Sequence, residues 1–485
     1  MKLGFSAVTV VIALVGGGFA CGSSSSGGAS GSSSGALAEA GTYDAPAPQS
    51  EAGSADAPAP VDHGAPSGTY PAFPPGFAQL KDQGGHVMKS PVIVAITWNS
   101  DASQATFDAF ADAIGGTTYW KTACSEYGVG PAVSGAVNHV HIATPPPATI
   151  LDSDIQAMVS ANAGGAPDGG VPEGGAPDAG APSWPAPSQD TIYAFFLPPG
   201  TSLQTQTFGG SGTQDACAAG EGGYHDQVTA AGVTTAYAVV PSCTFPGSAN
   251  TAMQQTTMSM SHELLEASTD AQPSSGAAYL GFDDDHFSFD YFQELQTENG
   301  DACEFYRDSF FERKETTPVP FDAWVQRTWS NASAAAGHNP CVPAPEGEPY
   351  FNVTPLEQQA VNVTLPSLVS PLLPGLSPNT KGFKGAAGKS VTFAVGFYSD
   401  GPTSGPWSVS VAAGNPLLGS KSLIEQYNPS TVTASIDLAS GQNGQKAYVT
   451  VDIKATGTLF AGEIVTVTST LNGRSHYMPV WIAGN

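Results

Sequence analysis

Short apolar runs alternate with helical patterns in the first half of the chain. Pro91–Trp98, Asp190–Leu197 and Ala236–Pro241 are rich in β-branched and aromatic residues, which predicts strands buried on both faces. Thr106–Ile114 and Ile150–Val159 place apolar residues three and four apart, which predicts helices. This order predicts an α/β (α+β) domain built on a central mixed sheet.

The pattern changes to alternation of apolar and polar residues in the last third of the chain. Short runs place apolar side chains two apart, and Gly, Pro, Asn and Ser separate them. These runs are Val391–Phe397, Trp407–Val411, Val432–Ile436, Ala447–Ile453 and Val465–Val467. Such a pattern predicts an all-β, immunoglobulin-like sandwich over 355–485. This region contains no Cys and no carboxylate cluster, so we expect spacing, binding or stability from it rather than chemistry.

Two tracts rich in Gly, Ala and Pro interrupt these patterns. Residues 22–83, which are also rich in Ser, predict a disordered tether. Residues 163–188 predict a flexible insertion within the first domain, whose limits we set at 84–344.

The first 21 residues predict export. Lys2 precedes the apolar run Phe5–Val15, which is too short to span a bilayer. Gly-Phe-Ala-Cys at 18–21 resembles a bacterial lipobox, so Cys21 would be the lipidated first residue of the mature protein. We therefore expect an outer-membrane lipoprotein of the bacterial cell envelope, held to the membrane through its N-terminal lipid only. An ordinary secretory signal is the alternative.

Charge narrows the range of partners. The chain of 485 residues carries a net charge of −27, and only 12% of its residues are charged. This field disfavours nucleic acid and anionic membranes as partners and favours cations.

Cysteine usage agrees with export. Five cysteines remain after the lipobox, which permits two disulfides and one free thiol. The pairs closest in sequence are Cys217–Cys243 and Cys303–Cys341, and they are the expected disulfides. Cys124 is then expected to be a buried free thiol; a nucleophilic role would require a His partner that its sequence neighbourhood lacks.

The segment from Met258 to Phe305 carries the candidate chemistry. His262, Glu263 and Glu266 form an H-E-x-x-E pattern in a helix-like stretch, where residues four apart lie on one face. This geometry allows His262 and Glu266 to bind zinc while Glu263 activates water as the catalytic base, as in a zincin-like domain. The third ligand would come from a pool of downstream carboxylates, Asp270, Glu298 and Asp301.

Several alternatives remain open at this site. His262 and Glu266 also fit an ordinary surface pair. Two carboxylate ligands make metal-bound water less acidic, so the site would be a weak hydrolase or a structural site that prefers calcium. A separate acidic loop, Asp283–Asp285 with Asp290, also offers ligands for calcium, although a solvated loop is equally expected.

Three of the histidines outside this segment carry a specific expectation. His225 follows Gly-Gly-Tyr and is a candidate extra metal ligand, with a hydrogen-bonded turn residue as the alternative. His139 and His141 alternate with apolar residues, which predicts one strand face that is exposed to solvent.

Several blocks of the chain together resemble the phosphate-induced protein 1 (exordium-like) family over about residues 84–342. The similar blocks are Ile96–Trp98, Gly223–His225, Tyr237–Val240, His262–Asp270, Gly300–Cys303 and Gln326–Asn331. Ala271 stands where the family usually has Pro, and Glu298-Asn-Gly-Asp301 replaces Glu-Ile-Gly-Asp. The resemblance implies a secreted, cell-surface role and no particular reaction.

These observations leave two functions. The first is metal-dependent hydrolysis of peptides by a metallopeptidase-like domain. The second is a non-catalytic surface module that binds a cell-surface glycan or protein, with the metal or acidic site holding its structure.

Overall fold

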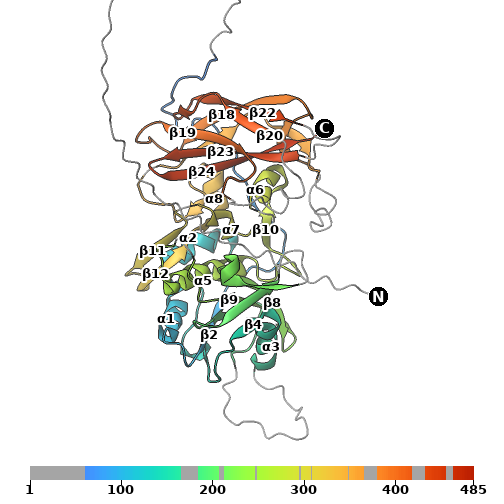
Figure 1. Cartoon of the computed structure of the whole chain (residues 1–485). Helices are drawn as coiled ribbons and strands as arrows, with labels where there is room; N and C mark the ends of the chain where they lie inside the picture. Colours follow the sequence, from blue (N-terminus) through green and yellow to red (C-terminus); the bar gives the residue numbers. More distant parts are fainter. Residues whose placement is uncertain are drawn as a thin grey trace, which may run out of the picture.

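The computed structural model describes residues 61–164, 184–206, 212–245, 248–293, 296–306, 308–347, 349–364, 379–417, 432–454 and 462–484. The predicted signal peptide, the lipidation site Cys21 and the predicted tether up to residue 60 lie outside these residues. The described part contains an α/β region followed by a β-sandwich (Figure 1).

A five-stranded mixed sheet organises the α/β region, which confirms the predicted sheet. Its strand order is β3 (His139–Ile142), β2 (Val92–Trp98), β5 (Thr191–Phe196), β9 (Val233–Val240) and β8 (Tyr224–Ala230). The first four strands run parallel, and the edge strand β8 pairs antiparallel with β9.

Helices cover both faces of this sheet, which explains why its strands are apolar without interruption. Ile93 and Ala95 of β2 face a core shared with α1 (Gln104–Ile114), α2 (Thr118–Cys124) and α5 (Ala252–Thr269). Val94 and Ile96 face the opposite way, into a core shared with α3 (Asp152–Asn162).

The remaining elements of this region are β1 (Leu80–Asp82), η1 (Ser125–Tyr127), η2 (Ala136–Asn138), β4 (Thr149–Leu151), β6 (Ser202–Gln206), β7 (Thr213–Asp215), α4 (Ala216–Ala219), β10 (Tyr279–Phe282), η3 (Asp284–His286), α6 (Phe287–Phe292), α7 (Asp301–Glu304), β11 (Phe310–Glu315), β12 (Phe321–Gln326), β13 (Thr328–Trp329), α8 (Asn331–Ala336) and β14 (Cys341–Val342).

Helix α5 lies in the middle of the α/β region. It starts at a capping box in which the Thr251 side chain accepts from the Gln254 backbone N–H and the Gln254 side chain accepts in return. Met253, Met260 and Leu264 recur at helical spacing and predict one apolar face, but every residue from Gln255 to Thr269 is buried. The reason is that the helix is covered by β9 and β8 on one side and by β12 on the other. Polar residues of α5 are therefore enclosed by protein.

Two packed sheets form the C-terminal region, which confirms the predicted sandwich. One sheet contains β15 (Phe351–Pro355), β18 (Ser390–Ser399), β22 (Lys446–Ile453) and β20 (Val432–Ile436) in that order. The other contains β16 (Gln359–Asn362), β17 (Asn379–Lys384), β24 (Arg474–Ala483), β23 (Gly462–Leu471), β19 (Trp407–Ala413) and β21 (Ser440–Gly441). Since β15 starts at Phe351, the sandwich begins before the predicted boundary at 355.

The sandwich and the α/β region share one hydrophobic core. Helix α6 lies between them (Figure 1), and its Phe287 ring is 5.1 Å from the Trp481 ring of β24. Phe77, ahead of β1, packs against Trp329 and Tyr350 in the same core. The two regions are therefore packed together through aromatic side chains.

Residues 61–83 belong to the folded structure, so the predicted tether is wrong for this stretch. Strand β1 pairs with β10. The Asn443 side chain of the sandwich accepts from Ala72 N and donates to the carbonyl oxygens of Ser67 and Thr69. Composition alone missed these anchors because few residues in a Pro- and Gly-rich stretch supply them.

The predicted insertion 163–188 is anchored at both ends. Ala163 and Trp184 form a parallel β-bridge, and Trp184 is buried in the core against Tyr193 and Phe195. The prediction of flexibility is therefore wrong for residues 184–188, while residues 165–183 lie outside the described part. Among the described residues, no helix combines the length and apolar character needed to cross a bilayer.

Candidate metal centre

The H-E-x-x-E residues lie on the buried middle turns of α5. His262, Glu263 and Glu266 expose only 6%, 5% and 2% of their surface. His262 Nε2 lies 2.9 Å from Glu266 Oε2. The predicted pairing at positions i and i+4 is therefore present, but in the interior rather than on the surface.

A histidine from the edge strand completes one side of this arrangement. His225 of β8 places Nδ1 3.6 Å from Glu263 Oε2 and 3.7 Å from Glu266 Oε2. Its Nε2 lies 3.3 Å from Glu298 Oε1. His225 is thus a buried member of the site rather than a turn residue, because α5 crosses directly beside β8.

The loop before α7 closes the other side. The backbone N–H groups of Gly300 and Asp301 both donate to Glu266 Oε1, at 3.1 and 3.0 Å. Asp301 Oδ1 lies 3.4 Å from His262 Nε2. The disulfide Cys303–Cys341 holds the adjoining helix, and both predicted disulfides are confirmed.

Gln326, at the end of β12, orients His262. Its Oε1 lies 2.9 Å from His262 Nδ1, and its Nε2 donates to Gly300 O at 2.8 Å. An amide oxygen accepts only from a protonated nitrogen, so the Nδ1–H tautomer leaves the Nε2 lone pair directed at Glu266 and Asp301. The H-E-x-x-E pattern does not predict Gln326 as a partner of His262, although Gln326 lies in one of the blocks that resemble the phosphate-induced protein 1 family.

We call His225, His262, Glu263, Glu266, Glu298 and Asp301 the α5 cluster. Two triads of metal-binding atoms, each within 4.8 Å, occur in it: His225–Glu263–Glu266 and Glu266–Glu298–Asp301. A third triad, His262–Asp301–Glu304, joins two of its members to Glu304. Glu304 was not among the candidates. Asp270 belongs to no triad found among the described residues: its Oδ1 accepts from Ala278 N, and its backbone oxygen lies 3.3 Å from His225 Nε2.

Excess negative charge is enclosed in the α5 cluster. Burial opposes protonation of the two imidazoles, but the carboxylates outweigh it, chiefly Glu298 at His225 and Glu266 at His262, and raise the pKa of both. For the carboxyl groups, burial disfavours the charged form and so raises the pKa of Glu263, Glu266 and Glu298. Within the described residues, no Lys or Arg pairs with these carboxylates. A bound cation would balance this charge.

The acidic loop predicted as a calcium site has other partners. Basic side chains lie 2.7–2.9 Å from its acids: His286 at Asp283, Lys81 at Asp284 and Lys381 at Asp285. Asp290 accepts from the Phe282 backbone N–H. In the described part of the chain, these carboxylates do not gather into a metal-binding triad. The three adjacent carboxylates of the loop are therefore each paired with a basic side chain.

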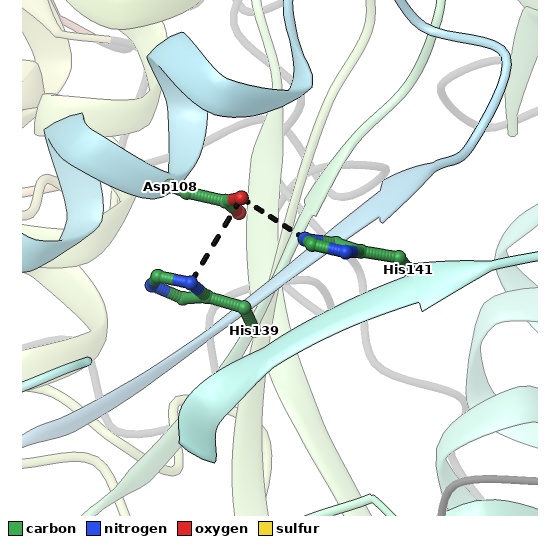
Figure 2. A group of neighbouring side chains, drawn as sticks. All are labelled: Asp108, His139 and His141. Carbon is green, nitrogen blue, oxygen red and sulfur yellow. Dashed lines mark hydrogen bonds and ion pairs between the residues drawn. The ribbon is translucent and has the colours of Figure 1, made fainter. Parts of the chain in front are cut away.

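Two other predictions concern Cys124 and the pair His139 and His141. Cys124 is a buried free cysteine, as predicted, and burial raises the pKa of its thiol well above the usual range. His139 and His141 do share one strand face, but both are directed at Asp108 of α1 instead of standing free in solvent (Figure 2). The sequence pattern missed Asp108 because it comes from a different element.

Comparisons with known proteins identify no family. No protein-family model and no curated protein matches the chain. Solved structures that match include domains 4 and 5 of the S-layer protein SbsC, at 16% identity over 27% of this chain and 46% of that one, with a TM-score of 0.15. SbsC domains 1–6 match at 16% identity over 28% of this chain and 14% of that one, and domains 4–9 at 14% over 37% and 22%, both with a TM-score of 0.15. This chain therefore spans less than half of each of these structures, and the similarity is too low to identify a fold or a function.

Proposed function

We propose that the α5 cluster binds a zinc ion and that the protein is a metal-dependent peptide hydrolase with a zincin-like α/β domain. The observation that carries this proposal is that buried Glu266 Oε2 lies 2.9 Å from His262 Nε2 and 3.7 Å from His225 Nδ1, while Asp301 Oδ1 lies 3.4 Å from His262 Nε2. Imidazole nitrogen and carboxylate oxygen are ligands that zinc accepts.

The donor set also fits zinc in its finer details. His262 carries its proton on Nδ1 toward Gln326, which leaves Nε2 as the ligand atom. Glu298 Oε1 and Asp301 Oδ1 are buried oxygens that face imidazole nitrogens, His225 Nε2 at 3.3 Å and His262 Nε2 at 3.4 Å. Zinc supplies Lewis-acid activation of water and of a peptide carbonyl when it is bound.

Glu263 is the residue available for proton transfer. It lies beside Glu266 on α5, and its Oε2 is 3.6 Å from His225 Nδ1. Burial raises its pKa, which brings the carboxylate closer to the range in which a general base is effective. Strand β8 offers a place for substrate, since no described strand pairs with its outer edge and an extended peptide can add to such an edge.

Zinc content and peptide hydrolysis test this function together. In the purified protein, His262→Ala is expected to lose the zinc of the α5 cluster. Glu263→Gln is expected to keep the zinc and to lose at least about 100-fold in hydrolysis rate, the usual scale of general-base catalysis. Mass spectrometry measures the metal, and a library of fluorogenic peptides measures the rate.

His338→Ala is the matched control, because the exposed His338 side chain pairs only with Asp400 among the described residues. Its zinc content and rate should equal those of the wild type. Retention of all zinc by His262→Ala would rule out the centre. Hydrolysis unaffected by Glu263→Gln would rule out the proposed base.

A structural cation site in a surface binding module is the second candidate. The depth of the α5 cluster favours this candidate, because a substrate would have to reach the metal. Even Glu298, the most exposed residue of the cluster, has only 14% of its side chain accessible. In that case zinc or calcium stabilises the fold, and the partner is a cell-surface glycan or protein that contacts the sandwich or another face. Bound metal in a wild type that cleaves no peptide would select this candidate.

We also propose that the protein is an envelope lipoprotein anchored through Cys21 and related to the phosphate-induced protein 1 family. Two disulfides support export, since they form in oxidising compartments. Cys21→Ala is expected to move the protein from the membrane pellet to the soluble fraction, whereas Cys124→Ala leaves it in the pellet. Equal fractionation of the wild type and Cys21→Ala would contradict lipid anchoring.

A further inference from the structure

A second group of metal-binding side chains lies at the far edge of the five-stranded sheet. Its members are Asp108 of α1 with His139 and His141 of β3, and their ligand atoms lie within 4.8 Å of one another. Strand β3 is the edge opposite β8, so three strands separate this group from His225. The two groups share no residue.

Local structure explains why these three side chains meet. Alternation along β3 places both imidazoles on one face, while Val140 between them is buried. Helix α1 packs over β2, the neighbour of β3. Its apolar residues face the core, and Asp108 projects toward the two imidazoles (Figure 2).

The contacts at Asp108 are unevenly distributed. His141 Nε2 lies 2.9 Å and His139 Nδ1 3.8 Å from the same oxygen, Oδ2. The other oxygen, Oδ1, is inaccessible and has no hydrogen-bond partner among the described residues. Oδ1 is therefore a buried acceptor that no described group satisfies. A cation bound between Asp108 and the imidazoles would satisfy it.

Asp112 fixes the orientation of His139. Its Oδ1 lies 2.8 Å from His139 Nε2 and is itself held by the Gly135 backbone N–H at 2.7 Å. A carboxylate oxygen accepts a hydrogen bond from Nε2–H, so the Nδ1 lone pair of His139 is directed toward Asp108. A carboxylate behind a ligating imidazole is the usual way in which proteins orient metal-binding histidines.

We propose that Asp108, His139 and His141 form a second, solvent-accessible site for a transition-metal dication of the zinc class. Two imidazoles and one carboxylate match the ligand preference of such ions. Three protein ligands leave a coordination position, and 37% of the His141 side chain is accessible to solvent beside it. Water or a donor group of a partner can occupy that position.

Zinc binding to the chelator-treated full-length protein tests the site. Equilibrium dialysis with Zn²⁺ should show, besides the zinc of the α5 cluster, one equivalent in the wild type whose binding His139→Ala and His141→Ala each weaken by at least about tenfold. Asp112→Asn should have a smaller effect in the same direction. Circular dichroism of the metal-free variants should match the wild type, since His139 and His141 lie on an edge strand.

Chemical modification distinguishes this site from the α5 cluster. Diethyl pyrocarbonate reacts with accessible imidazoles, and Zn²⁺ should suppress its reaction at His141, as read by peptide mass spectrometry. His338 is the matched control: it pairs with Asp400 at 3.1 Å and belongs to no triad of the described residues, so Zn²⁺ should leave its reaction unchanged. Reaction at His141 that is insensitive to Zn²⁺, or full zinc binding by His139→Ala and His141→Ala, would overturn the proposal.

Discussion

Replacing Gly300 with Ala is expected to lower the metal affinity of the α5 cluster by about 10- to 100-fold, the usual effect of displacing groups that orient a ligand. A methyl group on this residue would lie 2.7 Å from both Glu266 Oε1 and His262 Nδ1, well inside van der Waals contact. Neither side chain has room to move: His262 is held by Gln326, and Glu266 accepts from the Gly300 and Asp301 backbone N–H groups. The loop before α7, which carries Gly300, would therefore have to move away from α5.

Displacement of the loop before α7 would disturb both Asp301 and Glu266. Asp301 would move away from His262, and Glu266 would lose two backbone donors while it remains buried. We therefore expect a loss of about 1–3 kcal/mol in the free energy of unfolding in addition to the weaker metal binding. Calorimetric titration with Zn²⁺ measures the affinity, and urea denaturation measures the stability.

Gly276→Ala is the matched control for this change. Gly276 is exposed, adopts no positive φ, and has open space where a methyl group would project. Its metal affinity and stability should stay close to the wild type. Wild-type metal affinity in Gly300→Ala would show that the approach of the loop before α7 is not needed for the centre.

Local spacing was sufficient to predict the helical half of the site. His262, Glu263 and Glu266 lie within two helical turns, so their relative positions follow from helix geometry. The carboxylates Glu298 and Asp301 could be proposed because they precede a cysteine that was expected to be held in a disulfide. Their arrival at α5 depends on tertiary structure that no local pattern encodes.

Contacts between distant elements account for what the sequence did not reveal. Gln326 reaches His262 because β12 packs along α5, and His225 enters because β8 lies beside the same helix. Alternation placed His139 and His141 on one face, but only the position of α1 brings Asp108 to them. Helix α5 was expected to be amphipathic; it is buried throughout because elements far apart in sequence cover it from two sides.

Composition proved least reliable at the start of the described chain. Residues 61–83 are dominated by residues typical of disordered tracts, yet Phe77 is buried in the core shared by the two regions. Phe77 acts together with the β1–β10 pairing and the Asn443 hydrogen bonds to hold this segment. Average composition gives little weight to such isolated contacts.

Removal of the Cys303–Cys341 disulfide is expected to destabilise the protein by about 4 kcal/mol and to weaken metal binding at the α5 cluster. The bridge closes a loop with a sequence separation of 38, and chain entropy sets the scale of the stability loss. Metal binding should suffer because Cys303 lies on α7 with Asp301, whose carboxylate approaches His262. The double variant Cys303→Ala with Cys341→Ala tests both effects by urea denaturation and zinc titration.

The other disulfide separates the two effects. Cys217–Cys243 has a sequence separation of 26, so its removal should cost nearly the same stability, about 3.5 kcal/mol. Neither of its cysteines adjoins a residue of the α5 cluster in sequence, so zinc affinity measured under conditions where both variants are folded should be close to the wild type. A general loss of stability would weaken zinc binding equally in both double variants. A loss confined to the Cys303–Cys341 variant would show that this bridge positions Asp301, and equal losses would mean that α7 needs no covalent anchor to complete the centre.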